Sequence, residues 1–185
     1  SRWDPTQYIN IWLVNEICSG TSCGVAGYAF LPSAHGMDVD GIVMEARWFG
    51  SSEGNSSITV HEMGHYLGLY HTFQGGCKND DCLTDGDRVC DTPPDNLELP
   101  ASCLGIYNSC TTDEDDPSPN NPFRSIALGG LGDQNDQFQN YMDYSAYECY
   151  DQFTLGQSNR MRFFIEGARS SLLNSKACLP PCLAP

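Results

Sequence analysis

The fold of this chain is decided by the stretch His61-Glu62-Met63-Gly64-His65-Tyr66-Leu67-Gly68-Leu69-Tyr70-His71. It fits the pattern H-E-x-x-H-x-x-G-x-x-H at every fixed position, an arrangement typical of zinc ligands. His61 and His65 are four residues apart, so on a helix their imidazoles leave the same face. We therefore expect a helix over about residues 58–67 that carries two metal ligands on one side.

Gly68 explains how a third histidine can join the first two. If the helix continued, His71 would lie about 9 Å further along the axis than His65 and would be rotated off the shared face. The chain must therefore leave the helix and turn back. Glycine permits such a turn because it accepts positive φ without a steric clash at Cβ.

Three neutral imidazoles leave one position open on a tetrahedral zinc ion, as in catalytic zinc sites. Glu62 follows His61 on the helix, where it can act as general base toward a water molecule. A structural zinc site is the alternative, but it would be closed by a fourth ligand and would not need Glu62. The remaining histidine, His35, lies in a polar loop before Gly36, and we expect it to be a surface residue rather than a ligand.

The composition indicates one acidic, cysteine-rich domain. The chain has 185 residues, which suits a single domain, and a formal net charge of −15. This charge argues against nucleic acid and anionic membranes as partners, because both require a basic surface. No apolar run approaches the length of a membrane span. The ten cysteines include no C-x-x-C pair, so we expect about five disulfides and an oxidising compartment.

The region before the zinc pattern is expected to form a sheet. Residues 8–15 are typical of a buried strand, and residues 25–31 and 41–49 suggest two further extended segments. The segment near Gly41–Ala46 is the expected sheet edge, to which an extended substrate could add through main-chain hydrogen bonds.

The region after the zinc pattern differs. Residues 72–140 are rich in Gly, Pro, Asp, Asn and Cys, so we expect a long irregular region held by disulfides or bound Ca²⁺. Within it, residues 113–122 are expected to form a solvated loop. Thr154 and Gln157 form a capping box, which predicts a helix that continues to about Leu173.

A methionine follows the zinc pattern in the order that metzincin proteases have. Met142 lies in the segment Asn140-Tyr141-Met142-Asp143-Tyr144-Ser145, ahead of the last predicted helix. From His61 to that helix the sequence resembles the pappalysin family of metzincins. Besides the zinc pattern and Asn140–Tyr144, the resemblance rests on Thr72-Phe73-Gln74-Gly75-Gly76-Cys77, Gly86-Asp87-Arg88-Val89-Cys90-Asp91-Thr92-Pro93 and Phe153-Thr154-Leu155-Gly156-Gln157.

This resemblance implies an α+β, metzincin-type catalytic domain over residues 1–185. Residues 1–71 would form an upper subdomain, a twisted sheet with the zinc helix. Residues 72–185 would form an irregular lower subdomain, stapled by disulfides and closed by the C-terminal helix. Metzincins usually have another strand and a long helix before this segment, and the latent zymogen would also depend on upstream sequence.

The resemblance also implies roles for individual residues. Met142 would lie below the zinc, and Tyr144 would donate a hydrogen bond to the oxyanion of the reaction intermediate. A tyrosine that serves only packing is the alternative for Tyr144. Pappalysins often favour a basic residue after the scissile bond, and a buried or half-buried Asp151 is the candidate floor of that pocket.

One acidic loop resembles the Ca²⁺-binding segment of the family. Calcium suits it, because the loop offers several hard oxygen ligands on a flexible backbone. A solvated acidic loop is the alternative. The candidate ligands are Asp85, Asp87, Asp91 and Thr92.

Disulfide pairings follow in part from the same resemblance. By similarity, Cys77 would pair with Cys110 and Cys103 with Cys149. The remaining cysteines suggest local pairs, although connectivity does not follow from sequence alone. These pairs are Cys18–Cys23, Cys82–Cys90 and Cys178–Cys182.

The expected function is that of a secreted, monomeric zinc endopeptidase acting on proteins or peptides. A catalytically silent binding module would normally have lost a zinc ligand or Glu62, and neither is missing. Astacins and serralysins share the Met-x-Tyr turn but lack the Gly-Asp-x-Val-x-Asp-Thr-Pro segment, and adamalysins usually lack the tyrosine. An exopeptidase is disfavoured, because no arrangement for gripping a chain terminus is recognisable.

Overall fold

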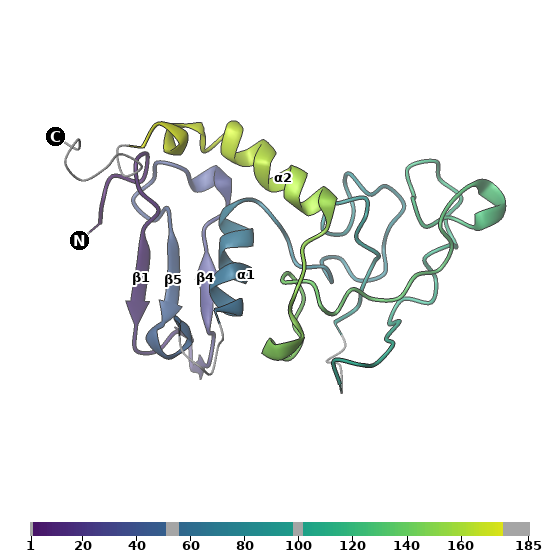
Figure 1. The fold of residues 1–185 in the computed structure, drawn as a ribbon, viewed down its shortest axis with the longest axis horizontal. Helices are drawn as coiled ribbons and strands as arrows, with labels where there is room; N and C mark the ends of the chain where they lie inside the picture. Colours follow the sequence, from purple (N-terminus) through teal and green to yellow (C-terminus); the bar gives the residue numbers. More distant parts are fainter. Residues whose placement is uncertain (1, 51–55, 98–101, 176–185) are drawn as a thin grey trace. The chain divides into compact units, whose positions relative to one another are not determined.

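The computed structural model describes residues 2–50, 56–97 and 102–175. The chain divides into two compact units (Figure 1). The first runs up to Gly68 and resumes at Arg160, and the second runs from Leu69 to Asn159. The division expected between residues 71 and 72 lies near the first of these boundaries. The end of the chain, however, groups with the first unit rather than with the second.

A three-stranded mixed sheet forms part of the first unit (Figure 1). Its strands, in spatial order, are β1 (Ile11–Val14), β5 (Ile42–Glu45) and β4 (Gly27–Ala29). β1 runs parallel to β5, whereas β4 runs antiparallel to it. Ile42 and Met44 of the central strand are fully buried, as expected for a strand covered by neighbours. A separate two-stranded ribbon pairs β2 (Cys18–Ser19) with β3 (Ser22–Cys23).

These strands lie within the three predicted extended segments, and each is shorter than expected. The prediction that residues 41–46 form a sheet edge is wrong, because β5 is hydrogen-bonded to a strand on either side. The edge strands of this sheet are β1 and β4. After β5 the chain forms the 3-10 helix η2 (Ala46–Trp48) rather than continuing as a strand.

Helix α1 (Ser57–Tyr66) packs against β4 and β5 and matches the predicted zinc helix. Two arginines from the end of the chain hold the backbone where this helix ends. Arg169 Nε donates to the Tyr66 carbonyl and Arg160 Nε to the Gly68 carbonyl, each over 2.8 Å. The guanidinium groups thus satisfy carbonyls that a helix end leaves without partners, and they oppose the negative end of the helix dipole.

Arg169 is fully buried, and Asp40 balances its charge. Its Nη1 lies 2.7 Å from Asp40 Oδ1, and both side chains are 0% exposed. His35 joins the pair, with Nδ1 3.0 Å from Asp40 Oδ2 and Nε2 2.8 Å from Ser171 Oγ. The prediction that His35 is a surface residue is therefore wrong, since its side chain is only 14% exposed. Its partner Ser171 is 136 residues away in sequence, beyond the reach of any local pattern.

The second unit has little regular secondary structure among its described residues. Apart from the first residues of α2, it holds the 3-10 helices η3 (Ile126–Leu128) and η4 (Tyr147–Cys149) and one isolated bridge, Asn140 to Gln152. This confirms the irregular region predicted after the zinc pattern. Three of the predicted disulfides cross-link it: Cys77–Cys110, Cys82–Cys90 and Cys103–Cys149. The predicted Cys18–Cys23 bond joins β2 to β3, and Cys178–Cys182 lies outside the described residues.

Aspartate and asparagine side chains take over part of the backbone hydrogen bonding in this unit. At five positions a side-chain oxygen accepts from the N–H group two residues later, which closes an Asx turn. These residues are Asp81, Asp87, Asp116, Asn121 and Asn140. The expectation that residues 113–122 form a solvated loop is wrong at two positions. Asp113 and Asn121 are fully buried, and Asn121 Nδ2 donates to the Asp113 carbonyl over 3.0 Å.

Helix α2 (Leu155–Glu166) begins at the predicted capping box. The backbone N–H of Gln157 donates to Thr154 Oγ1, and that of Thr154 donates to Gln157 Oε1, each over 3.0 Å. The helix ends before the predicted Leu173, because the Arg169 N–H bonds to the Phe164 carbonyl five residues back and closes the last turn. A 3-10 segment, η5 (Ser170–Asn174), follows.

Candidate active site

The three histidines of the zinc pattern come together along one continuous stretch of chain. His61 and His65 project from α1 with their Nε2 atoms 3.1 Å apart. One ligand nitrogen from each of His61, His65 and His71 lies within 4.8 Å of the other two. A tetrahedral zinc ion with bonds near 2.1 Å holds its nitrogens about 3.4 Å apart, so these side chains could hold one metal ion.

Glu62, which follows His61 on α1, is buried. Glu62 is only 5% exposed, and its Oε2 atom has no hydrogen-bond partner. Burial raises the pKa of the Glu62 carboxyl to about 8. An orphaned acidic oxygen next to a set of imidazoles fits a site where a cation and a water molecule bind, because both would favour the ionised carboxylate.

Strand β4 approaches Glu62 closely. A Cβ atom added at Gly27 would lie 3.0 Å from Glu62 Cγ and 3.2 Å from Glu62 Oε1. Any larger residue at this position would push on the predicted general base. Sequence reasoning did not single out Gly27, because its neighbour on α1 is 35 residues away and only the pairing of β4 with β5 brings it there.

Gly68 has the backbone conformation that the spacing of the histidines required. Its φ is 95°, and an added Cβ would lie 2.2 Å from Cδ2 of Phe164. The residue is therefore constrained twice, by the left-handed turn that directs the chain toward His71 and by an aromatic ring against its α-carbon.

The segment Asn140–Tyr144 around Met142, called the Met-turn below, lies in the second unit and is hydrogen-bonded to the residue that follows His71. The Met142 carbonyl accepts from the Thr72 N–H over 3.1 Å, and Met142 is fully buried. The Tyr144 ring makes an edge contact with the His71 ring, with centroids 4.8 Å apart. Tyr144 is 45% exposed. This position suits the role that the resemblance implied for Tyr144.

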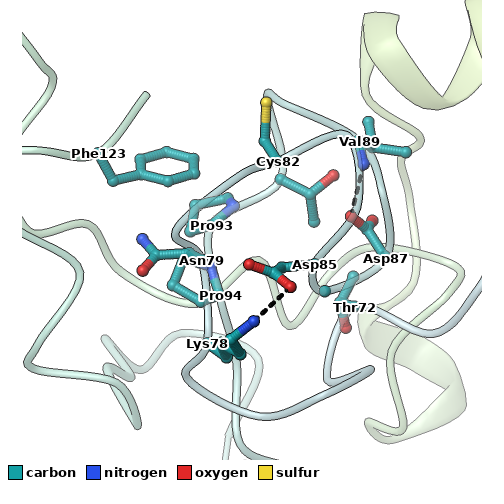
Figure 2. A pocket seen from close by; sticks show the side chains of 12 residues that line it. Thr72, Lys78, Asn79, Cys82, Asp85, Asp87, Val89, Pro93, Pro94 and Phe123 are labelled. Carbon is teal, nitrogen blue, oxygen red and sulfur yellow. Dashed lines mark hydrogen bonds and ion pairs between the residues drawn. The ribbon is translucent and has the colours of Figure 1, made fainter. Parts of the chain in front are cut away.

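Some of the candidate calcium ligands line one pocket in the second unit. Asp85, Asp87 and Thr92 are among its lining residues (Figure 2). Asp87 and Thr92 are 5% and 6% exposed, and Thr92 Oγ1 has no hydrogen-bond partner. Lys78 Nζ lies 2.7 Å from Asp85 Oδ1, which lowers the pKa of the Asp85 carboxyl through a hydrogen bond. An ammonium group therefore already neutralises part of this pocket, a pairing that the sequence pattern did not reveal.

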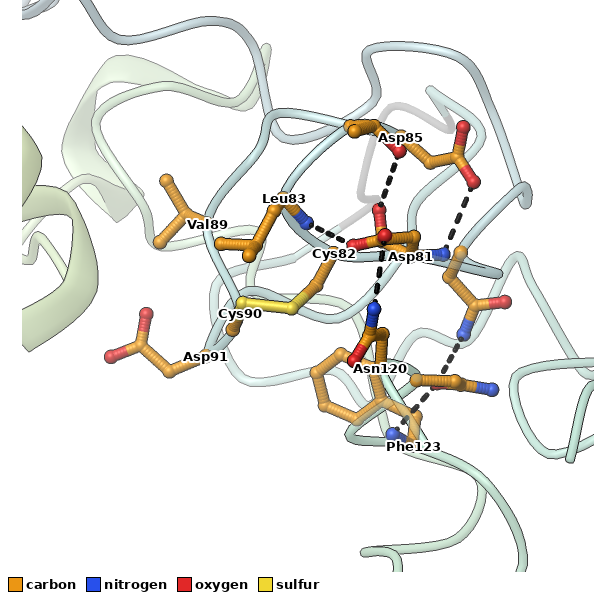
Figure 3. The surroundings of a disulfide bond; sticks show 12 residues. Asp81, Cys82, Leu83, Asp85, Val89, Cys90, Asp91, Asn120 and Phe123 are labelled. Atoms are coloured by element: carbon orange, nitrogen blue, oxygen red, sulfur yellow. Dashed lines mark hydrogen bonds between the residues drawn. A yellow bond between two sulfur atoms is a disulfide. The ribbon is translucent and has the colours of Figure 1, made fainter. Parts of the chain in front are cut away.

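The fourth candidate ligand, Asp91, is not among the residues that line this pocket. Figure 3 shows its carboxylate directed away from Asp81 and Asp85. Its oxygens accept from Thr154 Oγ1 over 2.7 Å and from the Gly156 N–H over 2.8 Å. Asp91 thus binds the N-terminus of α2, where a negative charge is favourable.

Asp151 is exposed, not buried or half-buried as the pocket hypothesis assumed. Its N–H donates to the Gln139 carbonyl over 3.0 Å, which fixes its backbone beside the bridge that precedes α2.

Comparison with known proteins places these features in a family. A family model described as "Pregnancy-associated plasma protein-A" (Peptidase_M43) matches residues 1–166. An extracellular metalloprotease of Arthroderma otae is 30% identical over 161 residues, covering 80% of this chain and 55% of that protein. Pappalysin-1 of Mus musculus is 28% identical over 189 residues, covering 100% of this chain and 11% of that protein. The chain thus spans little more than half of one relative and a small part of the other.

Solved structures support the same fold. Mature mirolysin of Tannerella forsythia, in complex with a cleaved peptide, superposes with a TM-score of 0.63 at 26% identity. The match covers 92% of this chain and 58% of that one. A second mirolysin structure, with a bound compound, gives a TM-score of 0.64 at 24% identity. The expected α+β metzincin fold is confirmed by these similarities.

Proposed function

Because this chain belongs to the Peptidase_M43 (pappalysin) family, we propose that it is the catalytic region of a zinc-dependent endopeptidase. The observation that carries the proposal is the gathering of His61, His65 and His71, together with a buried and unpartnered oxygen on Glu62, the residue that follows His61 on α1. A closed structural metal site would have no use for such a carboxylate.

The histidines, Glu62 and Tyr144 would each have a separate role in the reaction. The three histidines would hold a zinc ion, which when bound supplies Lewis acidity toward the scissile carbonyl and a water molecule. Glu62 would take a proton from the attacking water and deliver it to the leaving amine. The nearby positive charge would lower the carboxyl pKa from the value that burial alone produces, and so keep Glu62 ionised at neutral pH. Tyr144 would donate its hydroxyl proton in a hydrogen bond to the developing oxyanion.

The substrate is proposed to bind as an additional strand. β4 is an edge strand, it runs antiparallel to β5, and Gly27 within it lies against Glu62. An extended peptide paired with β4 would bring its main chain near the general base. We propose β4 for this role in place of the Gly41–Ala46 segment.

A preference for Arg or Lys after the scissile bond is a further part of the proposal, with Asp151 as the attracting carboxylate. Because Asp151 is exposed, solvent screens its charge, and we expect a graded preference rather than an absolute requirement.

Calcium binding is proposed at the pocket of Figure 2, through Asp85, Asp87 and Thr92. The ion would have to displace the Lys78 ammonium from Asp85, so Lys78 is expected to weaken binding.

The names of the relatives and the disulfides indicate where the protein acts. The fungal relatives are named extracellular metalloproteases, and four disulfides join described residues of this chain, which suits an extracellular location. No helix in the described part of the chain is long and apolar enough to span a bilayer. We propose protein or peptide substrates and a monomeric state.

The decisive experiment compares cleavage of a peptide library by the wild type, Glu62→Ala and Glu166→Ala, with and without a zinc chelator. Glu166 is an exposed glutamate at the end of α2 and serves as the matched control. We expect Glu62→Ala to lose about 10²–10⁴-fold in kcat/KM and the control to retain its rate. Bound zinc should be equal in all three proteins. Unchanged cleavage by zinc-loaded Glu62→Ala would exclude Glu62 as the base.

The residues that flank the cuts test the specificity. Replacing Asp151 by Asn should reduce the proportion of cuts before Arg and Lys, with little change for other sites. A wild-type library profile without basic enrichment would remove Asp151 from the proposal while leaving the zinc chemistry intact.

A further inference from the structure

The second unit contains a group of carboxylate and amide oxygens that the proposed chemistry does not use. Asp113 and Asp136 are buried, Asn108 is half-buried and Asp133 is exposed. Two segments, residues 107–109 and 133–136, run together there and are joined by polar contacts. Asn108 Nδ2 donates to Asp133 Oδ2 over 3.1 Å. The Ser109 N–H donates to Asp136 Oδ2 over 2.8 Å, and the Asp136 N–H donates to the Tyr107 carbonyl over 2.9 Å.

Asp113 adds a third carboxylate to this group from another part of the loop. Its Oδ2 accepts from the Gln134 N–H over 3.2 Å, so the carboxylate lies against the segment between Asp133 and Asp136. Asp113 is 0% exposed, and its Oδ1 has no hydrogen-bond partner. Asn108 Oδ1 is likewise buried and without a donor. Both unsatisfied atoms are acceptors, so the group that would complete this site must be a donor or a cation.

The charges around Asp113 also indicate a missing positive group. Among the described residues, neither Asp113 nor Asp133 has a basic side chain within ion-pair distance. Burial, together with the charges of Asp133 and Asp136, raises the pKa of the Asp113 carboxyl to about 7, against one opposing hydrogen bond from the Gln134 N–H. An isolated buried carboxylate beside like charges is costly unless a cation or a proton compensates it.

We propose that Asn108, Asp113, Asp133 and Asp136 form a binding site for one Ca²⁺ ion, separate from the pocket of Figure 2. None of these four residues lines that pocket. The available ligands are all hard oxygens, which excludes a preference for zinc or copper. Calcium is favoured over magnesium because an irregular loop can offer a variable set of oxygens, whereas magnesium demands near-ideal octahedral geometry.

The arrangement limits how the ion is held. The carboxylates of Asp113, Asp133 and Asp136 do not all lie within 4.8 Å of one another, in contrast to the nitrogens of the three histidines. At most two of these carboxylates therefore bind directly as the loop stands, with the Asn108 oxygen and water completing the shell. Such a partial ligand set is typical of sites with dissociation constants of about 10⁻⁴–10⁻³ M, which suit extracellular calcium.

The first test uses the unmodified sequence and needs no variant to fold. Hydrogen exchange of the wild type is followed with millimolar Ca²⁺, with Mg²⁺ and with a calcium chelator. The Ser109 and Gln134 amides should exchange about tenfold more slowly in Ca²⁺ than in the chelator, because their carboxylate acceptors become fixed. Mg²⁺ should have little effect. If the exchange rates of both amides were the same with and without Ca²⁺, the proposal would be overturned.

The second test counts bound calcium by equilibrium dialysis in the wild type, Asp113→Asn and Asp115→Asn. Asp115 is exposed in the same loop and controls for the change in net charge. Asp113→Asn should bind about one ion fewer, and Asp115→Asn should match the wild type. Equal counts in both variants would mean that Asp113 is simply a protonated buried acid. Should Asp113→Asn not fold, Asn108→Ala removes one of the unsatisfied oxygens and should weaken binding at least severalfold.

The two calcium proposals can be told apart. Asp87→Asn alters the pocket of Figure 2 and should leave the calcium-dependent protection of Ser109 and Gln134 in place. Loss of that protection in Asp87→Asn, with Asp113→Asn unaffected, would assign the ion to the pocket alone.

Discussion

The two units of this chain reach stability by different means. The first combines hydrogen-bonded strands, helix α1 and a fully buried ion pair between Asp40 and Arg169. The second replaces strands and helices by three disulfides and by Asx turns. The difference shows that side chains and cross-links can fix a backbone that forms almost no regular hydrogen-bond ladder. It also explains the acidic composition, since many aspartates in the second unit act as acceptors for backbone N–H groups.

The largest effect on stability is expected from Arg169→Leu in the first unit. The change leaves Asp40 buried without its partner and removes the hydrogen bond to the Tyr66 carbonyl at the end of α1. We expect a loss of about 3–5 kcal/mol in unfolding free energy, measured by urea denaturation.

Arg162→Leu is the matched control, because Arg162 is an exposed residue of α2. Hydrogen exchange should locate the damage in α1. If amide exchange in the second unit were accelerated as much as in α1, the two units would unfold together. They would then differ in structure but not in stability.

The second unit should depend most on its longer cross-links. Replacing Cys77 and Cys110 by serine removes a bond that closes 33 residues, with an expected cost of about 4 kcal/mol. The same change at Cys18 and Cys23, which are 5 residues apart, should cost about 2 kcal/mol. Thermal unfolding under non-reducing conditions measures both. Equal costs would argue that native contacts rather than chain entropy set the contribution of these bonds.

A single side chain in the Met-turn should have a smaller effect. Asn140 is fully buried; its Oδ1 accepts from the Met142 N–H over 2.9 Å, and its Nδ2 donates to Gln157 Oε1 over 2.8 Å. Asn140→Ala should cost about 1–3 kcal/mol, because buried partners lose their hydrogen bonds. The exposed Asn120 provides the control, and Asn120→Ala should cost much less. A similar loss in both variants would contradict the importance assigned to burial.

The last expected effect is a dependence of stability on pH. Burial raises the pKa of the Asp143 carboxyl from 3.8 to about 7, so the folded protein holds a proton that the unfolded chain releases. The contribution of the protonated Asp143 to the unfolding free energy is fully present below about pH 4, and it is lost as the pH rises toward about 7.

Urea denaturation across this range, without calcium, should show a flatter profile for Asp143→Asn than for the wild type. Asp115→Asn, an exposed position in the same unit, controls for the change in charge. A wild-type profile that rises over this range, or one that Asp143→Asn does not change, would contradict the assignment.

Local spacing was enough to predict much of the site. The intervals between His61, His65 and His71 require a helix, a turn at Gly68 and a return, and the structure has each of these. The capping box of α2 was also readable, because Thr154 and Gln157 lie within one turn of each other.

Contacts between distant residues could not be read in this way. The order of the strands depends on Ile11 pairing with Ile42, and the environment of His35 depends on Arg169. The burial of Asp113 depends on two hydrogen bonds, from the Gln134 N–H to its carboxylate and from Asn121 Nδ2 to its backbone carbonyl. Each of these contacts joins residues too far apart in sequence for periodicity or turn patterns to reveal it. The polar sequence around His35 and Asp113 therefore indicated a surface position for both.

The contact between Asp91 and the start of α2 has a consequence for how the chain folds. Asp91 precedes Thr154 by 63 residues, so a reduced chain must close a long loop before Asp91 can reach this helix terminus. The Cys103–Cys149 bond shortens the connecting path to roughly a quarter of that length, which lowers the entropic cost of closure by about 1 kcal/mol. We therefore expect formation of the Cys103–Cys149 bond to favour the contact between Asp91 and the start of α2. Because disulfide formation is much slower than helix formation, this contact should form at the rate at which the Cys103–Cys149 bond forms.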